Sequence, residues 1–360
     1  MAQFLRADAQ IFNPFSDYIA EQATLRSSFI TSGLVSMNPV IEANITKGDT
    51  CTLPSWAPNL DGAIQVPTEG VMLTVNKLLT AQQTGVIHHR ANAWGASDLA
   101  ALAVGAANDP MAAIGAKIAS YVANAQQAVL LATLKGLFGV PGTLNSSYAL
   151  TGMTIDGGTS QTDLSLTHVV RGDLLLGEDE DAYGILIIHP DTNAVLKVQS
   201  AYRYVRADEL PGITASTIAA GSITASNAIA ADNSGAFETG SKQVPVFAGK
   251  RVIVSDSAPR VGSPGSYKYM SFMCRPGGMA FGYQAPIRTE TDRDILTSSG
   301  EDVVKVQWDA CFHMLGTSYS GATGAGEPTN ATLETAASWT KVFDNKNIGA
   351  VAINHTLPAL

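Results

Sequence analysis

The sequence predicts an α+β protein in which thin extensions surround one long helix and a smaller α/β body. Three patterns lead to this class. Apolar residues recur at spacings of three and four over residues 111–138, which is the period of a helix. Apolar and polar residues alternate over 71–76, as in a strand with one covered face. The continuous apolar run within 184–189 suits a buried strand, and a helix pattern follows it as far as Val198.

Composition restricts the classes of function. The chain has 360 residues, of which 46% are hydrophobic and only 15% are charged, whereas about a quarter are charged in a typical globular domain. A surface that largely faces other protein would explain this, and an ordinary compact protein is an equal alternative. The net charge is −9 and no Lys/Arg run occurs, which argues against sequence-specific nucleic-acid binding. A wall that only encloses nucleic acid need not be basic.

The cysteines and the N-terminus bear on the compartment. Cys51, Cys274 and Cys311 lie far apart, so neither a disulfide framework nor a zinc site is expected, and a reducing cytoplasm fits. Arg6 and Asp8 interrupt any apolar run of a secretory signal. No stretch reaches the ~20 apolar residues of a membrane span. We therefore expect no membrane association.

The first ninety residues read as extensions of the molecule. Ser16 and Gly33 can begin and end a short helix, and 37–39 reads as extended or turning chain. Residues 50–92 then predict a long two-stranded ribbon on which Trp56 could anchor an intersubunit contact, with a local turn contact as an equal alternative. Because an isolated ribbon is only marginally stable in water, we expect it to gain burial from a neighbouring molecule.

A short helix after Ser97 is expected to precede the long one. Asp109 is a good N-cap for the long helix, Pro110 suits its first position, and Gly139 suits its end. At 1.5 Å per residue, residues 111–138 would span about 42 Å. A helix of that length exceeds the diameter of a small domain, so we interpret it as a spine.

The rest of the chain mixes helices and strands. A helix is expected over 169–176, and the low-complexity stretch 211–241, which repeats Ile-Thr-Ala-Ser, suits a hairpin or an exposed insertion. Further strands are expected at 244–247, 251–254, 267–274, 279–283, 286–291, 302–315 and 348–353. In the strand 302–315, alternation places five residues on one face: Val304, Val306, Trp308, Ala310 and Phe312.

No catalytic, cofactor or metal signature stands out. His88 and His89 are adjacent, so in a strand they face opposite ways and cannot bind one metal ion together. The acidic run 178–181 lacks the ligand spacing of a calcium loop, and the charges within 288–294 suggest an ion-pair network. There is no nucleophile elbow, P-loop or dinucleotide fingerprint. We expect no enzyme activity, cofactor or metal, although a site assembled from distant residues would escape this reasoning.

Short motifs add a family resemblance. They are Asn13-Pro14-Phe15, Trp94-Gly-Ala-Ser-Asp98 before Asp109-Pro110, Leu134-Lys-Gly-Leu-Phe-Gly139, Trp339-Thr-Lys-Val and Asp344-Asn-Lys-Asn-Ile348. With the order of parts, they resemble the major capsid proteins of tailed bacteriophages with the Hong Kong 97 fold. The resemblance implies self-assembly into hexamers and pentamers of an icosahedral shell around double-stranded DNA. It also implies synthesis in the bacterial host, location in the virion, and scaffold, portal and decoration proteins as partners.

The resemblance also assigns the regions of the chain. They are an N-arm (1–49), an E-loop (50–92), a P-domain with the spine helix (93–150), an A-domain (151–299) with an insertion (207–243), and a P-domain return with C-terminal strands (300–360). In this family the E-loop overlaps a neighbouring subunit. The candidate intersubunit contacts are therefore Trp56, Asp61, Val71, Leu73, Val75 and Arg90.

Three alternatives stay open from the sequence. A nanocompartment shell of the same fold would enclose cargo proteins and not DNA. A soluble hydrolase with a dispersed site would be a monomer with activity. A tail-tube protein would form cylinders.

Overall fold

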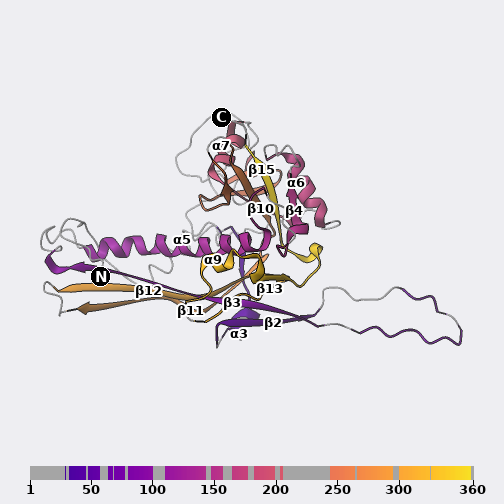
Figure 1. Ribbon diagram of the computed structural model, residues 1–360, viewed down its shortest axis with the longest axis horizontal. Helices are drawn as coiled ribbons and strands as arrows, with labels where there is room; N and C mark the ends of the chain where they lie inside the picture. The colour runs from indigo at the N-terminus through magenta and orange to yellow at the C-terminus, as the bar shows by residue number, and fades with distance from the viewer. Residues whose placement is uncertain are drawn as a thin grey trace, which may run out of the picture.

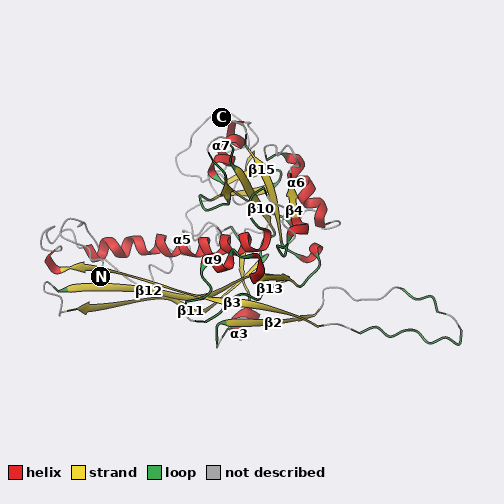
Figure 2. Cartoon of the chain, in the orientation of Figure 1, coloured by secondary structure: helices red, strands yellow, loops and turns green. Residues whose placement is uncertain are grey.

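The molecule is elongated: a long sheet and a long helix form its base, a smaller body stands on them, and a thin loop projects from one end (Figure 1). The computed structural model describes residues 29, 32–45, 48–56, 64–67, 69–77, 80–99, 110–142, 147–156, 164–176, 182–198, 203–205, 244–263, 266–294, 300–324 and 326–357. Figure 2 shows the long strands and the long helix of the base, and the mixture of shorter helices and strands in the upper body.

The long sheet forms the base. Its strand order is β1 (Val35–Met37), β11 (Met279–Asp294), β12 (Glu301–Met314), β3 (Thr80–Ser97) and β2 (Thr50–Trp56). β1 is parallel to β11, and the other neighbours are antiparallel. The five residues predicted to share a face of β12 are all buried, which confirms that alternation. Helix α5 lies against β12 and β3.

Helix α5 (Pro110–Phe138) confirms the predicted spine. Gly139 ends it with φ of +101°, and its N–H donates to the carbonyl of Lys135 at 2.7 Å; glycine reaches this conformation without steric cost. A Cβ atom on Gly136 would lie 1.9 Å from the carbonyl oxygen of Leu333, so only glycine lets α9 (Asn330–Leu333) pack this closely. The expected cap Asp109 lies outside the described residues. Over the described ranges, no helix combines the length and the apolar character needed to cross a membrane.

The second sheet forms the upper body. Its order is β4 (Thr154–Asp156), β15 (Ala350–Thr356), β10 (Lys268–Cys274), β5 (Ile185–Ile188), β8 (Lys250–Val254), β7 (Val244–Phe247) and β6 (Arg203–Val205), with β9 (Arg260–Val261) paired to β10. β5 is wholly buried and parallel to β8, as its continuous apolar run predicts. The helices are α6 (Leu166–Asp173) and α7 (Pro190–Val198).

Smaller elements complete the fold. They are α3 (Pro39–Asn44), the hairpin of β13 (Thr317–Tyr319) and β14 (Trp339–Lys341), and short 3-10 turns at Thr151–Met153, Ala336–Ser338 and Asn345–Asn347. The low-complexity insertion lies outside the described residues. The strands on either side of it, β6 and β7, pair antiparallel.

Several local predictions are corrected. The strands expected at 279–283 and 286–291 are one strand, β11, whose register shifts twice between Tyr283 and Arg288; Pro286 lacks an N–H donor, and such residues are tolerated at irregularities. Residues 37–39 were expected to be extended or turning, and Met37 and Asn38 are extended. Pro39 instead starts α3, where the side chain of Asn38 accepts a hydrogen bond from the N–H of Val40 at 2.9 Å. Ser97 is the last residue of β3, and Asp98 and Leu99 directly after it are helical, which agrees with the short helix expected after Ser97; its continuation lies outside the described residues.

The two sheets cut across the expected region boundaries. β11 lies within 151–299 but belongs to the long sheet, and β15 lies within 300–360 but belongs to the upper one. The reason is that the chain passes between the two sheets three times, from β3 to β4, from β10 to β11 and from β12 to β15. The last two passages touch, because the N–H of Arg275 donates to the carbonyl of Gly349 at 2.7 Å. One hydrophobic core joins both bodies. The ring of Phe138 at the end of α5 lies 5.8 Å from that of Phe272 in β10.

Candidate assembly surface

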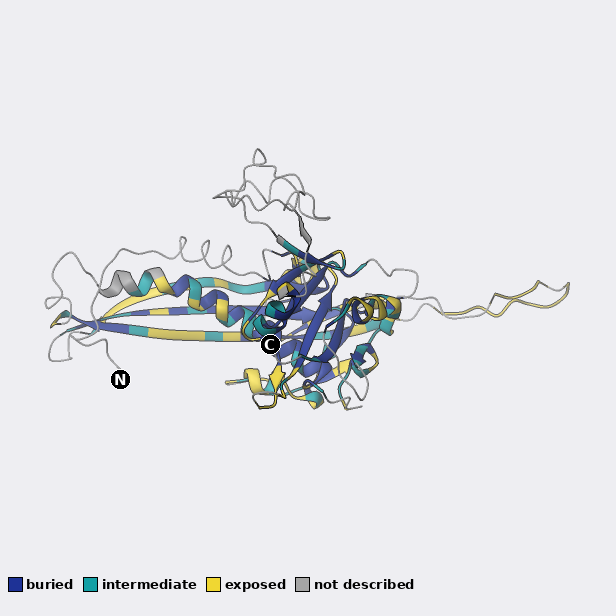
Figure 3. Ribbon diagram, turned by 90° about the horizontal axis from the view of Figure 1, so that it is seen from above, coloured by how far each residue is buried: buried dark blue, intermediate teal, exposed yellow. Residues whose placement is uncertain are grey.

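The loop between β2 and β3 projects into solvent. Its described residues, 64–67 and 69–77, form two extended limbs beyond the end of the β2–β3 ribbon (Figures 1 and 3). Six large apolar side chains on these limbs are 59–100% exposed: Ile64, Val66, Val71, Met72, Leu73 and Val75. Contiguous exposed apolar surface of this kind marks an interaction site in a soluble protein.

The limbs are held together by one side chain. The amide of Gln65 donates to the carbonyl of Thr74 and accepts from the N–H of Thr74, both at 2.8 Å. No backbone hydrogen bond joins the described parts of the two limbs. As far as the described residues go, their other backbone groups are therefore open to water or to another chain.

The root of the loop is firmly built. β2 pairs with the first part of β3 along its whole length, from Thr50 opposite Val86 to Trp56 opposite Thr80. A small apolar cluster that includes Cys51 and Cys311 lies at this root. Both thiols are free, and burial raises the pKa of each, so they stay protonated and act as packing groups. Trp56, at the last pair of this ladder, is 63% exposed.

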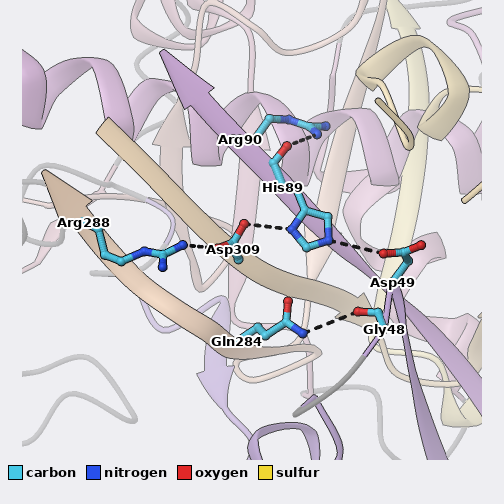
Figure 4. A network of polar contacts seen from close by, with 7 residues as sticks. All are labelled: Gly48, Asp49, His89, Arg90, Gln284, Arg288 and Asp309. Atoms are coloured by element: carbon cyan, nitrogen blue, oxygen red, sulfur yellow. Dashed lines mark hydrogen bonds and ion pairs between the residues drawn. The ribbon is translucent and has the colours of Figure 1, made fainter. Parts of the chain in front are cut away.

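A polar network ties this root to the long sheet (Figure 4). The ring of His89 lies between two carboxylates: its Nδ1 is 2.8 Å from Oδ1 of Asp309, and its Nε2 is 3.7 Å from Oδ1 of Asp49. Arg288 of β11 donates to the other oxygen of Asp309 at 2.8 Å. Asp49 immediately precedes β2, so the network connects the start of the ribbon with β3, β12 and β11. It thereby helps to fix the direction in which the loop projects.

The predicted contacts divide into three groups. Trp56, Val71, Leu73 and Val75 are exposed on the loop or at its root. Asp61 lies outside the described residues. Arg90 is half-buried, and its guanidinium donates to the carbonyl of Pro328 at 2.8 Å and to the side chain of Asn330 at 3.1 Å, so its bonding capacity is used within the chain.

Sequence reasoning missed three exposed members of the surface: Ile64, Val66 and Met72. Ile64 and Val66 alternate with polar residues between Gly62 and Gly70, and this alternation was a usable signal. Met72 falls on the positions assigned to the polar side of the expected strand. In the structure both sides of the limb are exposed, so the distinction does not apply.

The described part of the chain assembles no metal site. No three His, Cys, Asp or Glu residues there are placed to hold a metal ion. The hydroxyl of Ser271 lies 2.9 Å from Nε2 of His355, but both residues are buried, and burial lowers the pKa of His355 to about 4. This pair is closed to a substrate and packs as part of the core.

The other chemical predictions resolve as structural features. His88 is buried and His89 is exposed, which confirms that they face opposite ways. Arg293 forms ion pairs with Asp98 and Asp302, so the charges of 288–294 do form ion pairs, though with partners outside that segment. The acidic run 178–181 lies outside the described residues.

Comparisons with known proteins agree with each other. A family model described as "Major capsid protein 13-like" matches residues 214–352. The chain is 28% identical to the major capsid protein of Bacillus phage SPP1 over 356 residues, which cover 97% of this chain and 96% of that one. Among solved structures, the capsid of Ralstonia phage GP4 superposes with a TM-score of 0.53 at 10% identity, over 90% of this chain and 87% of that one. The capsid of a native GTA particle gives a TM-score of 0.52 at 12% identity, over 96% and 93%.

Proposed function

We infer that this chain is the major capsid protein of a tailed bacteriophage, with the Hong Kong 97 fold, and that copies of it form the icosahedral shell of the virion. The likeness to the SPP1 protein extends over nearly the whole length of both chains. The fold agrees with those of phage capsids. The role is structural.

The exposed loop is the observation that carries this inference. Six large apolar side chains cannot be covered by the loop itself, which has two thin limbs and one side-chain link. Burial of apolar surface contributes about 25 cal/mol per Å² of favourable free energy. A neighbouring subunit lying over the loop would therefore stabilise the assembly by an amount that is not available to the monomer. We propose that the loop corresponds to the E-loop and that Trp56, Val71, Leu73 and Val75 contact the next subunit.

The finer organisation of the shell is also a proposal. We propose hexamers and pentamers as its units, with the upper sheet as the A-domain and the long sheet with α5 as the P-domain. The net charge of −9 suits a wall that encloses double-stranded DNA without reading its sequence. Scaffold, portal and decoration proteins would be its further partners.

The test replaces residues 61–79 with a short Gly/Ser linker. The replaced segment stops at residue 79 because Thr80, Ala81 and Gln82 pair with β2. Keeping these pairs leaves the fold intact, so that a loss of particles can be attributed to the loop. We expect a folded protein with an unchanged melting temperature that forms no closed particles by negative-stain microscopy. Closed particles in normal yield would contradict the role of the loop.

A milder variant provides the matched control. Val71→Ser, Leu73→Ser and Val75→Ser together keep the length of the loop and remove three of its six large exposed apolar side chains, whereas Thr74→Ser and Asn76→Ser on the same limb leave all six in place. Only the first set should prevent assembly. Nuclease-protected DNA inside wild-type particles would support the phage shell, and cargo protein without DNA would instead indicate a nanocompartment.

A further inference from the structure

The ring of His89 lies between two acidic side chains that belong to different parts of the long sheet. Its Nδ1 is 2.8 Å from Oδ1 of Asp309 in β12, and its Nε2 is 3.7 Å from Oδ1 of Asp49, which precedes β2 (Figure 4). Because a carboxylate only accepts hydrogen bonds, the short contact requires a hydrogen on Nδ1. In the neutral ring Nε2 then carries a lone pair.

The contact with Asp49 depends on whether the ring is protonated. The neutral ring turns the lone pair of Nε2 toward a carboxylate oxygen, and two acceptors form no bond; a separation of 3.7 Å is also too long for one. Once Nε2 takes up a proton it becomes a second donor. A charge-assisted bond of about 2.8 Å then needs a closure of roughly 1 Å. The structure therefore has the geometry of an open clamp.

The other charged groups at this place leave Nε2 to Asp49. Arg288 of β11 donates to Oδ2 of Asp309 at 2.8 Å. Arg90 donates to the backbone carbonyl of His89 at 3.0 Å and to the chain around α9, not to the ring. His88 faces the opposite way, and burial lowers its pKa to about 3, so it stays neutral. Among the described residues, no further charged side chain forms an ion pair with the ring.

The clamp lies at the inner end of the ribbon formed by β2 and β3. The N–H of Ile87 donates to the backbone carbonyl of Asp49 at 2.9 Å. From there the ladder runs outward to the pair of Trp56 and Thr80, where the loop begins. β2 has 7 residues, which extend over roughly 23 Å, and among the described strands it pairs only with β3. A small shift at the clamp is therefore magnified at the loop.

We propose that His89 is a proton-operated clamp, which in acid draws Asp49 onto β3 and fixes the inner end of the ribbon. Its stabilisation is present when the ring is protonated and is lost as the pH rises through the range of about 5–8 in which histidine changes charge. The clamp is a property of the single chain. Its effect on assembly rests on the proposed function, because a ribbon held in one orientation presents the loop to a neighbour at a lower entropic cost.

Hydrogen exchange of the unassembled full-length chain measures the clamp. The amide of Ile87 reports on it directly, because its N–H bonds to Asp49. Between pH 8 and pH 5.5 its protection, corrected for the intrinsic pH dependence of exchange, should rise roughly two- to fivefold, as for other exposed ion pairs. The amides of β15 in the upper sheet provide the reference for changes that affect the whole molecule.

Two substitutions remove the proton dependence. His89→Gln keeps a donor for the carboxylate of β12 but takes up no proton, and Asp49→Asn removes the charge that attracts the proton. In both variants the protection of Ile87 should be equal at the two pH values. The matched control is Glu290→Gln, which breaks another exposed pair of the long sheet, 3.7 Å from Lys305. It should keep the rise seen in the wild type.

Nitrogen-15 spectra of the His89 ring test the same clamp independently. At pH 8 Nδ1 should carry the hydrogen and Nε2 should be bare, and at pH 5.5 both should be protonated. A bare Nδ1 at pH 8 would overturn the proposal. So would a wild-type protection of Ile87 that does not rise in acid, or a rise that persists in His89→Gln.

Particle formation separates the clamp from the proposed function. The wild type should assemble faster at pH 6 than at pH 8, by roughly the two- to fivefold factor of the exchange experiment, whereas His89→Gln should assemble at equal rates. Equal wild-type rates would overturn the link between clamp and assembly. If the wild type forms no particles at either pH, the proposed function fails, while hydrogen exchange still decides whether the clamp exists.

Discussion

Strand β12 and the loop at 64–77 contain similar apolar residues in opposite surroundings. In β12, Val304, Val306 and Trp308 alternate with more polar residues and are at most 7% exposed. In the loop, Val71 and Val75 are at least 67% exposed. Composition alone does not distinguish the two segments. The difference is that β12 lies between two strands and under α5, whereas no described residue outside the loop covers these side chains.

The comparison separates two sources of free energy. Residues such as Trp308 contribute to the free energy of unfolding of the monomer, because their burial is complete before any copy meets another. Residues such as Val75 contribute only when a neighbour covers them. A protein built in this way can fold first and assemble later, and substitutions should sort cleanly into the two classes.

The largest difference in the free energy of unfolding should be seen when Trp is replaced by Ala at a buried position and at an exposed one. Trp308→Ala removes a side chain that is 2% exposed and packs edge-on against Phe312, and should lower the free energy of unfolding by about 3–5 kcal/mol. Trp56→Ala removes one that is 63% exposed, and should change it by only about 0.5 kcal/mol while reducing particle yield. Denaturant titration and particle counting measure the two effects. Equal losses of monomer stability would break the distinction.

The second largest effect should be a fall in the free energy of unfolding in acid, caused by buried histidines. Burial lowers the pKa of His88 to about 3 and those of His313 and His355 to about 4, against about 6.5 in an unfolded chain. Below pH 6.5 the unfolded chain therefore binds protons that the folded chain excludes. The stability present above that pH should fall by about 1.4 kcal/mol per pH unit for each histidine until the folded pKa is reached.

Denaturant titration of the monomer at several pH values between 4 and 7 measures this slope. His88→Leu should reduce it by the share of one histidine, since it removes a buried titrating group. A slope unchanged by that substitution would contradict the assignment. No histidine lies in 57–79, so this titration belongs to the body of the molecule.

A smaller effect is expected at the root of the loop. The side chain of Asp309 is 7% exposed and pairs with both His89 and Arg288. Asp309→Asn should therefore lower the free energy of unfolding by about 1–2 kcal/mol. The loss is smaller than for a fully buried pair, because Arg288 is half-exposed. Arg293→Ala, which breaks the exposed pairs with Asp98 and Asp302, is the control and should leave unfolding unchanged. If both variants unfold alike, the network of Figure 4 does not anchor the loop root.

Local patterns predicted the elements well. The three- and four-residue spacing that ends at Gly139 gave the spine helix, and alternation along β12 gave its buried face, because each pattern records burial along one element. Pro286 suggested a break that the structure absorbs as shifts of register within β11. Asn38 and Pro39 were a helix-capping signal that we interpreted as extended or turning chain.

Long-range arrangement could not be predicted in the same way. Nothing in residues 350–356 indicates that β15 pairs with β10 and β4 in the upper sheet, because sheet partners are selected by the whole fold. The candidate assembly surface was partly predictable, since its apolar residues stand between glycines and prolines. The start of α6 was not predicted, because the helix was expected over 169–176, whereas it begins at Leu166 after its cap at Ser165.

In the proposed shell, strand β3 would have a mechanical consequence. It continues from the root of the loop to the far end of the long sheet and is hydrogen-bonded to β2 along its first part and to β12 along the rest. A pull on the loop is therefore directed along the strand and loads many hydrogen bonds in shear at once, so that they yield together and not one after another. The tension between subunits is spread over the widest part of each molecule.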